Sequence, residues 1–162
     1  MKQVAGLLMM VAAALVQVTW APHLEIAGAF PNLVLSAVIA IAWTFGVRVG
    51  MAWACAGGVL LDFTSAGPIG PHALALVCGA YLTGFWTRNL DRDNAAQTVL
   101  AAVVCTACYS VILVGCDDTL GLPVPPLPVA LQLTFAACAY NAILTPLALP
   151  LVRRLRPAEA VA

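Results

Sequence analysis

The chain has 162 residues, of which 63% are hydrophobic and only 9% are charged, with a formal net charge of zero. Ordinary globular domains are about 45–50% apolar and about 25% charged, so this composition excludes a soluble domain. No basic block is present for binding nucleic acid. The length excludes a large multidomain enzyme, and most of the six cysteines lie inside apolar runs rather than in a disulfide framework. What remains is a membrane protein with several spans.

Six apolar runs are long enough to be membrane helices, which need about 20 residues to cross the hydrocarbon layer. We predict an all-α integral membrane protein, a single domain over residues 1–162, with spans at 4–20, 31–47, 49–63, 71–87, 95–115 and 129–152. Arg48 alone separates the second and third runs. The first run also fits the start of a signal peptide, but no small-x-small cleavage site precedes Pro22. A retained helix is therefore favoured.

The basic residues predict the orientation, because Lys and Arg favour the cytoplasmic side of short loops. With six spans, all seven fall on the side of the two termini: Lys2, Arg48, Arg88, Arg92, Arg153, Arg154 and Arg156. The opposite side holds His23, Glu25, Asp117 and Asp118. Both termini are therefore predicted to be cytoplasmic.

The third and fourth spans look short. From Arg48 to Asp62 a helix covers only about 21 Å, and from Pro71 to Arg88 about 26 Å. The turn at 64–70 would then lie below the outer headgroups, which non-helical backbone tolerates only inside protein or beside a watery cavity. We predict an outward-facing recess floored by Asp62 and by the turn Gly67, Pro68, Ile69 and Gly70.

Asp62 is the acidic residue that this reasoning places within the hydrocarbon, where a charge is costly and often functional. The favoured interpretation is structural, with the carboxylate accepting N–H bonds from the turn at 64–67. An unpaired carboxylate would instead be a proton site. Ser65 and His72 suggest an intramembrane hydrolase, but no orienting group or G-x-S-x-G motif accompanies them. We expect no enzyme, no cofactor and no metal site.

Small residues recur every fourth position at Gly46, Gly50, Ala54 and Gly58. Such stripes let helix backbones approach closely in membranes, and packing inside the bundle is favoured here over contact with a partner. Asn141 lies near the middle of the last span and predicts an interhelical hydrogen bond, while Pro146 should kink or loosen that span. The Pro-rich loop at 116–128 either folds onto the bundle or meets another protein.

Three segments resemble the bacterial rod shape-determining protein MreD. They carry Pro31-Asn32 before the second span, a block with Gly58, Asp62, Ser65, Gly67, Gly70, Ala73 and Leu74, and Asn141 with Pro146 before Arg153-Arg154. The resemblance covers roughly 30–90 and 138–156. One departure is Ala66, which stands between Ser65 and Gly67 where the family often has serine directly before glycine.

The resemblance implies a non-catalytic scaffold of the cell-wall elongation complex, which supports peptidoglycan synthesis and rod cell shape. Its implied partner is an MreC-like single-span protein. Through that partner it would reach a RodA-type glycosyltransferase, an elongation-specific penicillin-binding transpeptidase and an actin-like filament protein. The family's fold is also similar to the substrate-binding subunits of energy-coupling-factor transporters. The alternative function is therefore a solute-binding transporter subunit that uses the recess near Asp62.

Overall fold

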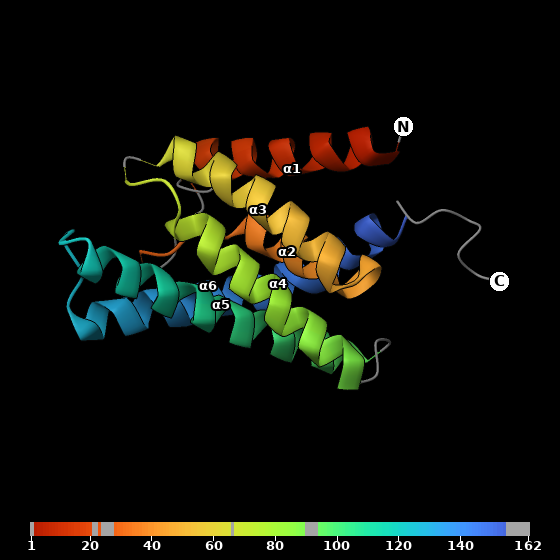
Figure 1. Cartoon of the computed structure of the whole chain (residues 1–162). Helices are drawn as coiled ribbons and strands as arrows, with labels where there is room; N and C mark the ends of the chain where they lie inside the picture. Colours follow the sequence, from red (N-terminus) through yellow and green to blue (C-terminus); the bar gives the residue numbers. More distant parts are fainter. Residues whose placement is uncertain (1, 21–22, 24–27, 66, 90–93, 155–162) are drawn as a thin grey trace.

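The protein is all-α in the computed structural model, which describes every residue except 1, 21–22, 24–27, 66, 90–93 and 155–162 (Figure 1). The described part of the chain forms six helices: α1 Lys2–Thr19, α2 Leu33–Phe45, α3 Val47–Thr64, α4 Pro71–Asn89, α5 Ala95–Thr119 and α6 Leu127–Arg153. Each helix falls on one of the six predicted apolar runs. Most boundaries differ from the predicted ones by one or two residues, and the differences at two junctions change how the chain turns.

The first difference is the junction between α2 and α3, which is Gly46 and not Arg48. Gly46 has φ +93°, a conformation that glycine adopts without steric cost, so the chain turns within one residue. Arg48 consequently lies in the first turn of α3 instead of between the helices.

The second difference is the end of α5, which continues through Asp117 and Asp118 to Thr119. Gly121, two residues beyond the helix, reverses the chain with φ +70°. The N–H of Gly121 donates to the Asp118 carbonyl at 3.1 Å, and the N–H of Leu122 donates to the Asp117 carbonyl at 2.9 Å. These two bonds form a Schellman motif, which satisfies the last carbonyls of the helix. The predicted loop at 116–128 therefore shortens to 120–126.

The last helix accommodates three prolines. Pro128 lies in its first turn, where the missing N–H would have no helical partner. Pro146 and Pro150 lie inside α6, which is assigned as helix without a break from Leu127 to Arg153.

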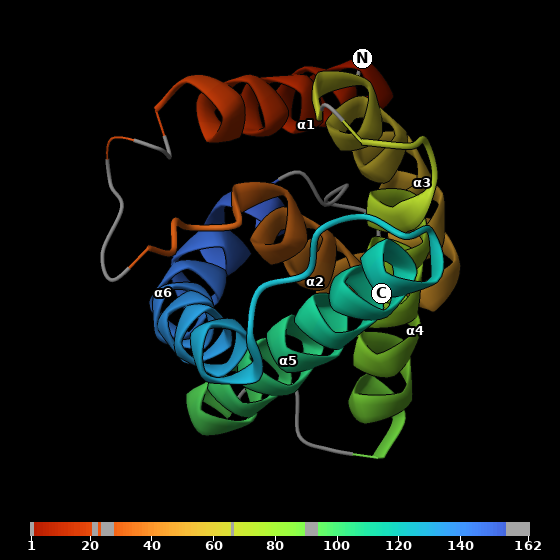
Figure 2. The same cartoon turned by 90° about the vertical axis from the view of Figure 1, so that its left-hand side faces the viewer.

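The buried centre of the bundle is α2, which packs against all five other helices (Figure 2). All its residues from Val34 to Thr44 are buried, as expected for a helix that is apolar on every face. Within the described residues α1 packs only against α2 and α3, so it lies at the edge of the bundle.

Three of the described helices, α3, α5 and α6, are long and apolar enough to cross a membrane by length and composition. Two further apolar segments are shorter, Met10–Thr19 of α1 and Leu33–Phe45 of α2. With 13 residues, α2 is only about 20 Å long.

The helices alternate in direction, so α1 begins and α6 ends at the same end of the bundle (Figure 1). We call this the basic end, because Arg48 in the first turn of α3, Arg88 in the last turn of α4 and Arg153 in the last turn of α6 lie there. We call the opposite end the acidic end, since it holds the end of α3 with Asp62 and the end of α5 with Asp117 and Asp118.

Candidate functional site

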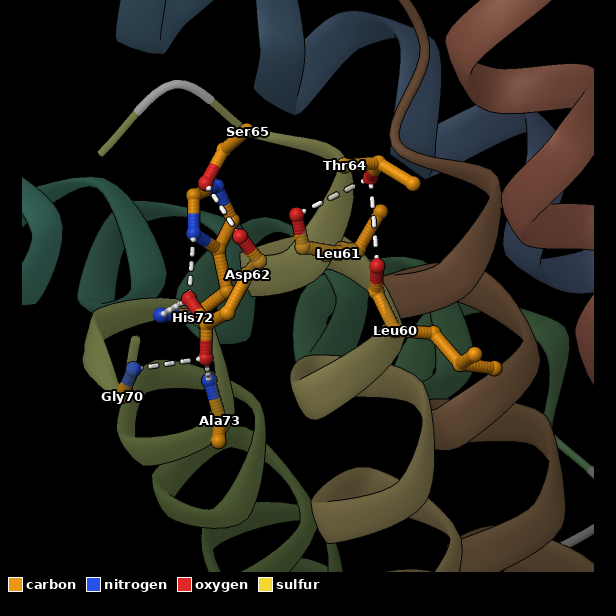
Figure 3. Close-up of polar contacts among 8 residues, drawn as sticks. All are labelled: Leu60, Leu61, Asp62, Thr64, Ser65, Gly70, His72 and Ala73. Atoms are coloured by element: carbon orange, nitrogen blue, oxygen red, sulfur yellow. Dashed lines mark hydrogen bonds and ion pairs between the residues drawn. The ribbon is translucent and has the colours of Figure 1, made fainter. Parts of the chain in front are cut away.

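The Asp62 carboxylate, in the last turn of α3, gathers four hydrogen bonds at the start of α4 (Figure 3). Its Oδ2 accepts from the backbone N–H groups of Gly70 at 2.9 Å and Ala73 at 3.3 Å. Its Oδ1 accepts from the N–H of His72 at 3.0 Å and lies 2.9 Å from His72 Nδ1. We call this arrangement the Asp62 cluster.

The cluster has a local physical cause. The first turn of a helix leaves N–H groups without helical partners, and the helix dipole favours a negative charge there. Asp62 is 1% exposed and supplies both the acceptors and the charge for α4. The donors differ from those predicted, because they belong to Gly70, His72 and Ala73 and not to the turn at 64–67.

Gly58 sets the distance between α3 and α4 at this point. It lies one turn before Asp62, and a Cβ atom there would overlap the backbone of Ala73. The missing side chain thus brings the start of α4 close enough for Asp62 to reach it. Small residues allow this kind of approach between helices.

The other members of the predicted stripe have different surroundings. A Cβ at Gly50 would overlap Ala42 of α2, and Ala54 is fully buried. Gly46 precedes α3, and a Cβ there would meet nothing within 4 Å. The stripe on α3 is therefore filled by contacts within the chain at Gly50, Ala54 and Gly58.

His72 extends the cluster toward α5. Its ring meets the ring of Tyr109 edge-on, with centroids 6.2 Å apart and an interplanar angle of 64°. Ser65 donates its hydroxyl to the Asp62 carbonyl at 2.9 Å. Within the described residues no hydrogen bond joins Ser65 to His72. The orienting group for His72 that the sequence did not reveal is Asp62 itself.

A second polar cluster surrounds Asn141 and joins α2, α5 and α6. Asn141 is fully buried; its Oδ1 accepts from Ser36 Oγ at 3.2 Å and from the N–H of Asn32 at 3.3 Å. Its Nδ2 donates to Thr106 Oγ1 at 3.0 Å, and Thr145 donates to Ser36 at 3.3 Å. We call this the Asn141 cluster. Pro146 follows Thr145 and forms none of these bonds.

The start of α2 is satisfied by side chains from two elements. Gln17 of α1 accepts from the N–H of Val34 at 2.9 Å, and the Asn32 side chain accepts from the N–H of Leu35 at 2.9 Å. Sequence reasoning gave Gln17, Thr106 and Tyr109 no role. The sequence feature that could have identified these three residues is a polar side chain inside an apolar run.

A pocket of about 320 Å³ opens at the acidic end between these two clusters. Its polar lining consists of Gln17, Asn32, His72, Thr106, Tyr109, Ser110, Thr134 and Asp117. A second pocket of about 230 Å³ shares Gln17 and His72 and also includes Ser65. Asp62 and the turn at 67–70 line neither pocket, because the carboxylate is enclosed by the start of α4.

The described residues that line the 320 Å³ pocket carry negative charge only. Its lining contains the carboxylate Asp117 and no Lys or Arg. A neutral or cationic group is therefore better matched to this pocket than an anion. Within the described residues, no group of three or more His, Cys, Asp or Glu side chains is placed to hold a metal ion.

Searches of curated proteins and of solved structures found no match to this chain. A family model does match: residues 1–122 fit the rod shape-determining protein MreD. This match covers most of the chain, including the Asp62 cluster, and confirms the resemblance at 30–90, whereas the motif segment at 138–156 lies outside it. The chain belongs to the MreD family of rod shape-determining proteins.

Proposed function

We propose that this protein is a non-catalytic membrane scaffold of the cell-wall elongation complex and binds an MreC-like single-span protein. The observation that carries the proposal is the family match over residues 1–122, which implies a role in rod shape determination. Proteins of this family are generally non-catalytic. The scaffold would support peptidoglycan synthesis and rod shape in the bacterial cytoplasmic membrane.

The proposal includes a single domain with six spans and both termini in the cytoplasm. The separation of charge supports it, since the basic residues of α3, α4 and α6 share one end of the bundle. Basic residues favour the cytoplasmic side. The three long apolar helices, α3, α5 and α6, and the buried apolar α2 are consistent with insertion.

We assign the docking of the partner's span to α1. Leu8, Leu15 and Val18 are exposed on this helix and Val11 is half-buried. Their spacing of three, four and three residues is that of the seam between two helices in a coiled coil. Exposed Ala12 and Thr19 flank the seam, and small residues allow close approach in a membrane.

The position of α1 in the bundle supports the same surface. Because α1 packs only against α2 and α3 among the described residues, its remaining side is open. The glycine stripe on α3 is a weaker candidate, since Gly50 and Gly58 are occupied by Ala42 and Ala73. The sequence left partner contact at this stripe as the less favoured alternative, and we propose α1 as the docking helix instead.

The loop at 120–126 is the proposed contact for the external part of the partner. Leu120 and Leu122 are exposed there, and Val124 is half-buried. Prolines at 123, 125 and 126 make the segment stiff, which lowers the entropy lost on binding. Contact with the RodA-type glycosyltransferase, the elongation-specific transpeptidase and the actin-like filament protein is proposed to be indirect.

Affinity purification from native membranes in mild detergent tests the scaffold. Mass spectrometry of the retained proteins and small molecules should find a single-span coiled-coil protein together with wall synthases. A coupling ATPase without those proteins would contradict the proposal.

A pair of matched variants tests the docking surface. Ala12→Phe places a large side chain on the exposed face of α1, and Ala139→Phe does the same on the exposed face of α6. Ala12→Phe should abolish co-purification of the single-span partner, while Ala139→Phe should not. Equal thermal melting of both variants excludes misfolding as the cause. Retention of the partner by Ala12→Phe would move the contact away from α1.

The solute-binding subunit of a transporter is the second candidate function, and the pocket of about 320 Å³ favours it. Its lining combines apolar walls with a few polar groups, which is typical of small-molecule sites. Asp62 would act there by orienting His72, since its own carboxylate is enclosed. This function predicts a small molecule retained on purification and released by Tyr109→Ala. Absence of any retained molecule would exclude it.

A further inference from the structure

A separate pocket of about 320 Å³ opens at the basic end of the bundle. It lies between the end of α2, the start of α3 and the last two turns of α4. Arg48 and Arg88 line it from different helices, and Phe45 and Val47 form apolar walls. The pocket shares no residue with those at the acidic end.

Glycines shape this pocket. The turn at Gly46 separates α2 from α3, and its missing side chain leaves open space. On the other side, a Cβ at Gly84 would overlap Val47, so α4 passes directly against the start of α3. The two arginines are therefore brought to the same opening by the packing of the backbone.

Among the described residues, the charge at this opening is positive. Arg48 and Arg88 are both exposed, and neither forms an ion pair with a described residue. The described carboxylates, Asp62, Asp117 and Asp118, belong to the acidic end. The start of α3 also has no side-chain cap, which leaves its first N–H groups available. An anion with several oxygens matches these donors, because guanidinium groups bind phosphate through paired hydrogen bonds.

The surroundings of the arginines indicate a lipid rather than a soluble anion. Tyr81 and Phe85 precede Arg88 by two turns and one turn, and both side chains are more than 60% exposed. Val49, beside Arg48, is also exposed. An apolar strip thus leads from the charged opening along the outside of α4, where an acyl chain can lie against the aromatic rings.

We propose that this pocket binds the phosphate of an anionic phospholipid, with Arg48 and Arg88 as its ligands and Tyr81 and Phe85 against its acyl chains. Basic pockets between membrane helices bind such headgroups on the cytoplasmic side. The lipid would belong to the cytoplasmic leaflet, which rests on the orientation proposed above. The binding itself does not depend on the scaffold function.

The test uses the full chain, purified in mild detergent, stripped of lipid and titrated with phosphatidylglycerol. Phosphatidylglycerol should raise the melting temperature more than phosphatidylethanolamine does, while inorganic phosphate should leave it unchanged. Arg48→Gln and Arg88→Gln should each weaken the apparent affinity about fivefold, as expected for one basic residue at a membrane surface. The matched control Arg154→Gln removes one charge at the same end, outside the pocket, and should leave the affinity unchanged.

Three outcomes would overturn the proposal. Equal weakening by Arg154→Gln would indicate general charge attraction, and an equal effect of inorganic phosphate would indicate a soluble anion. Unchanged affinity of the Arg48→Gln and Arg88→Gln variants would exclude the pocket. If either Gln variant does not fold, Phe85→Ala replaces it. Native mass spectrometry should then count one bound phosphatidylglycerol fewer than in the unmodified chain, and an equal count would exclude the site.

Discussion

The Asp62 cluster and the Asn141 cluster each satisfy the hydrogen bonds of a polar side chain that is buried in an apolar bundle. Asp62 is satisfied mainly by backbone donors 8 to 11 residues further along the chain. Asn141 is satisfied by groups 35 to 109 residues away on α2 and α5. The first cluster fixes two consecutive helices to each other, and the second joins α2 to α5 and α6, which lie much further along the chain.

The two clusters therefore differ in how easily their hydrogen-bonding groups find another partner. A carboxylate has no substitute among the neutral side chains near the start of α4, so its loss leaves several N–H groups unpaired. The side chains around Asn141 have other partners: Thr145 donates to Ser36, and Thr106 donates to the carbonyl of Ala102. We therefore expect the Asp62 cluster to contribute more to stability than the Asn141 cluster.

The largest effect should come from Asp62→Ala. It removes a buried charge acceptor from three backbone donors and from His72, and should lower the free energy of unfolding by about 4 kcal/mol. Asp62→Asn keeps one acceptor oxygen and should lose about half as much. Chemical unfolding in mild detergent measures both. A wild-type transition for Asp62→Ala would show that the carboxylate is not a structural group.

Gly58→Ala should follow, because its Cβ would overlap the Ala73 backbone and push α4 away from Asp62. Overpacking of this kind costs about 1–3 kcal/mol, and we expect the upper end because backbone cannot rotate aside. Gly115→Ala is the matched control, since a Cβ there meets nothing within 4 Å. It should be neutral or slightly stabilising. Equal melting temperatures for the two variants would contradict the role given to Gly58.

Asn141→Leu should cost only about 1 kcal/mol, because interhelical hydrogen bonds in membranes are individually weak. The side chain keeps its volume, and the hydroxyls of Ser36 and Thr106 retain partners on neighbouring groups. Unfolding measured beside Asp62→Ala gives the comparison directly. A loss as large as that of Asp62→Ala would reverse the ranking of the two clusters.

The smallest effect should come from Ser36→Ala, at about 0.5 kcal/mol. It removes one of the two donors to Asn141 Oδ1 and the acceptor of Thr145. Ser110→Ala serves as control, since no hydrogen bond of its hydroxyl is found in the described part of the chain. Both variants should unfold cooperatively. A loss of unfolding free energy above about 2 kcal/mol for Ser36→Ala would mean that the other groups of the Asn141 cluster do not compensate for the missing hydroxyl.

The same contrast explains what could be predicted from the sequence. The six helices follow from the length of the apolar runs, which is a local property. Asp62 was singled out as a structural acceptor because it stands beside a turn. Its donors at Gly70, His72 and Ala73 were not identified, since they depend on how closely Gly58 lets α4 approach.

No local sequence pattern indicates which residues far along the chain become partners of Asn141. An interhelical bond was predicted for Asn141, but Ser36 and Thr106 lie on helices whose adjacency no periodicity encodes. The same holds for Gln17 and Tyr109, which line the pocket of about 320 Å³ at the acidic end. The prediction that Arg48 separates α2 from α3 is wrong, because the backbone turns at Gly46.

The shortness of α2 has a consequence for the fit of the protein to its bilayer. A lipid-facing helix of about 20 Å would leave a hydrophobic mismatch of about 10 Å against a hydrocarbon layer of about 30 Å. Since α2 is enclosed by five helices, that mismatch falls inside the protein. The 320 Å³ pocket at the acidic end is lined by Asn32 at one end of α2, and the arginine-lined pocket at the basic end is lined by Phe45 and Gly46 at the other. A cavity thus lies at each end of α2, where a longer helix would continue, and the bilayer does not need to thin around the protein.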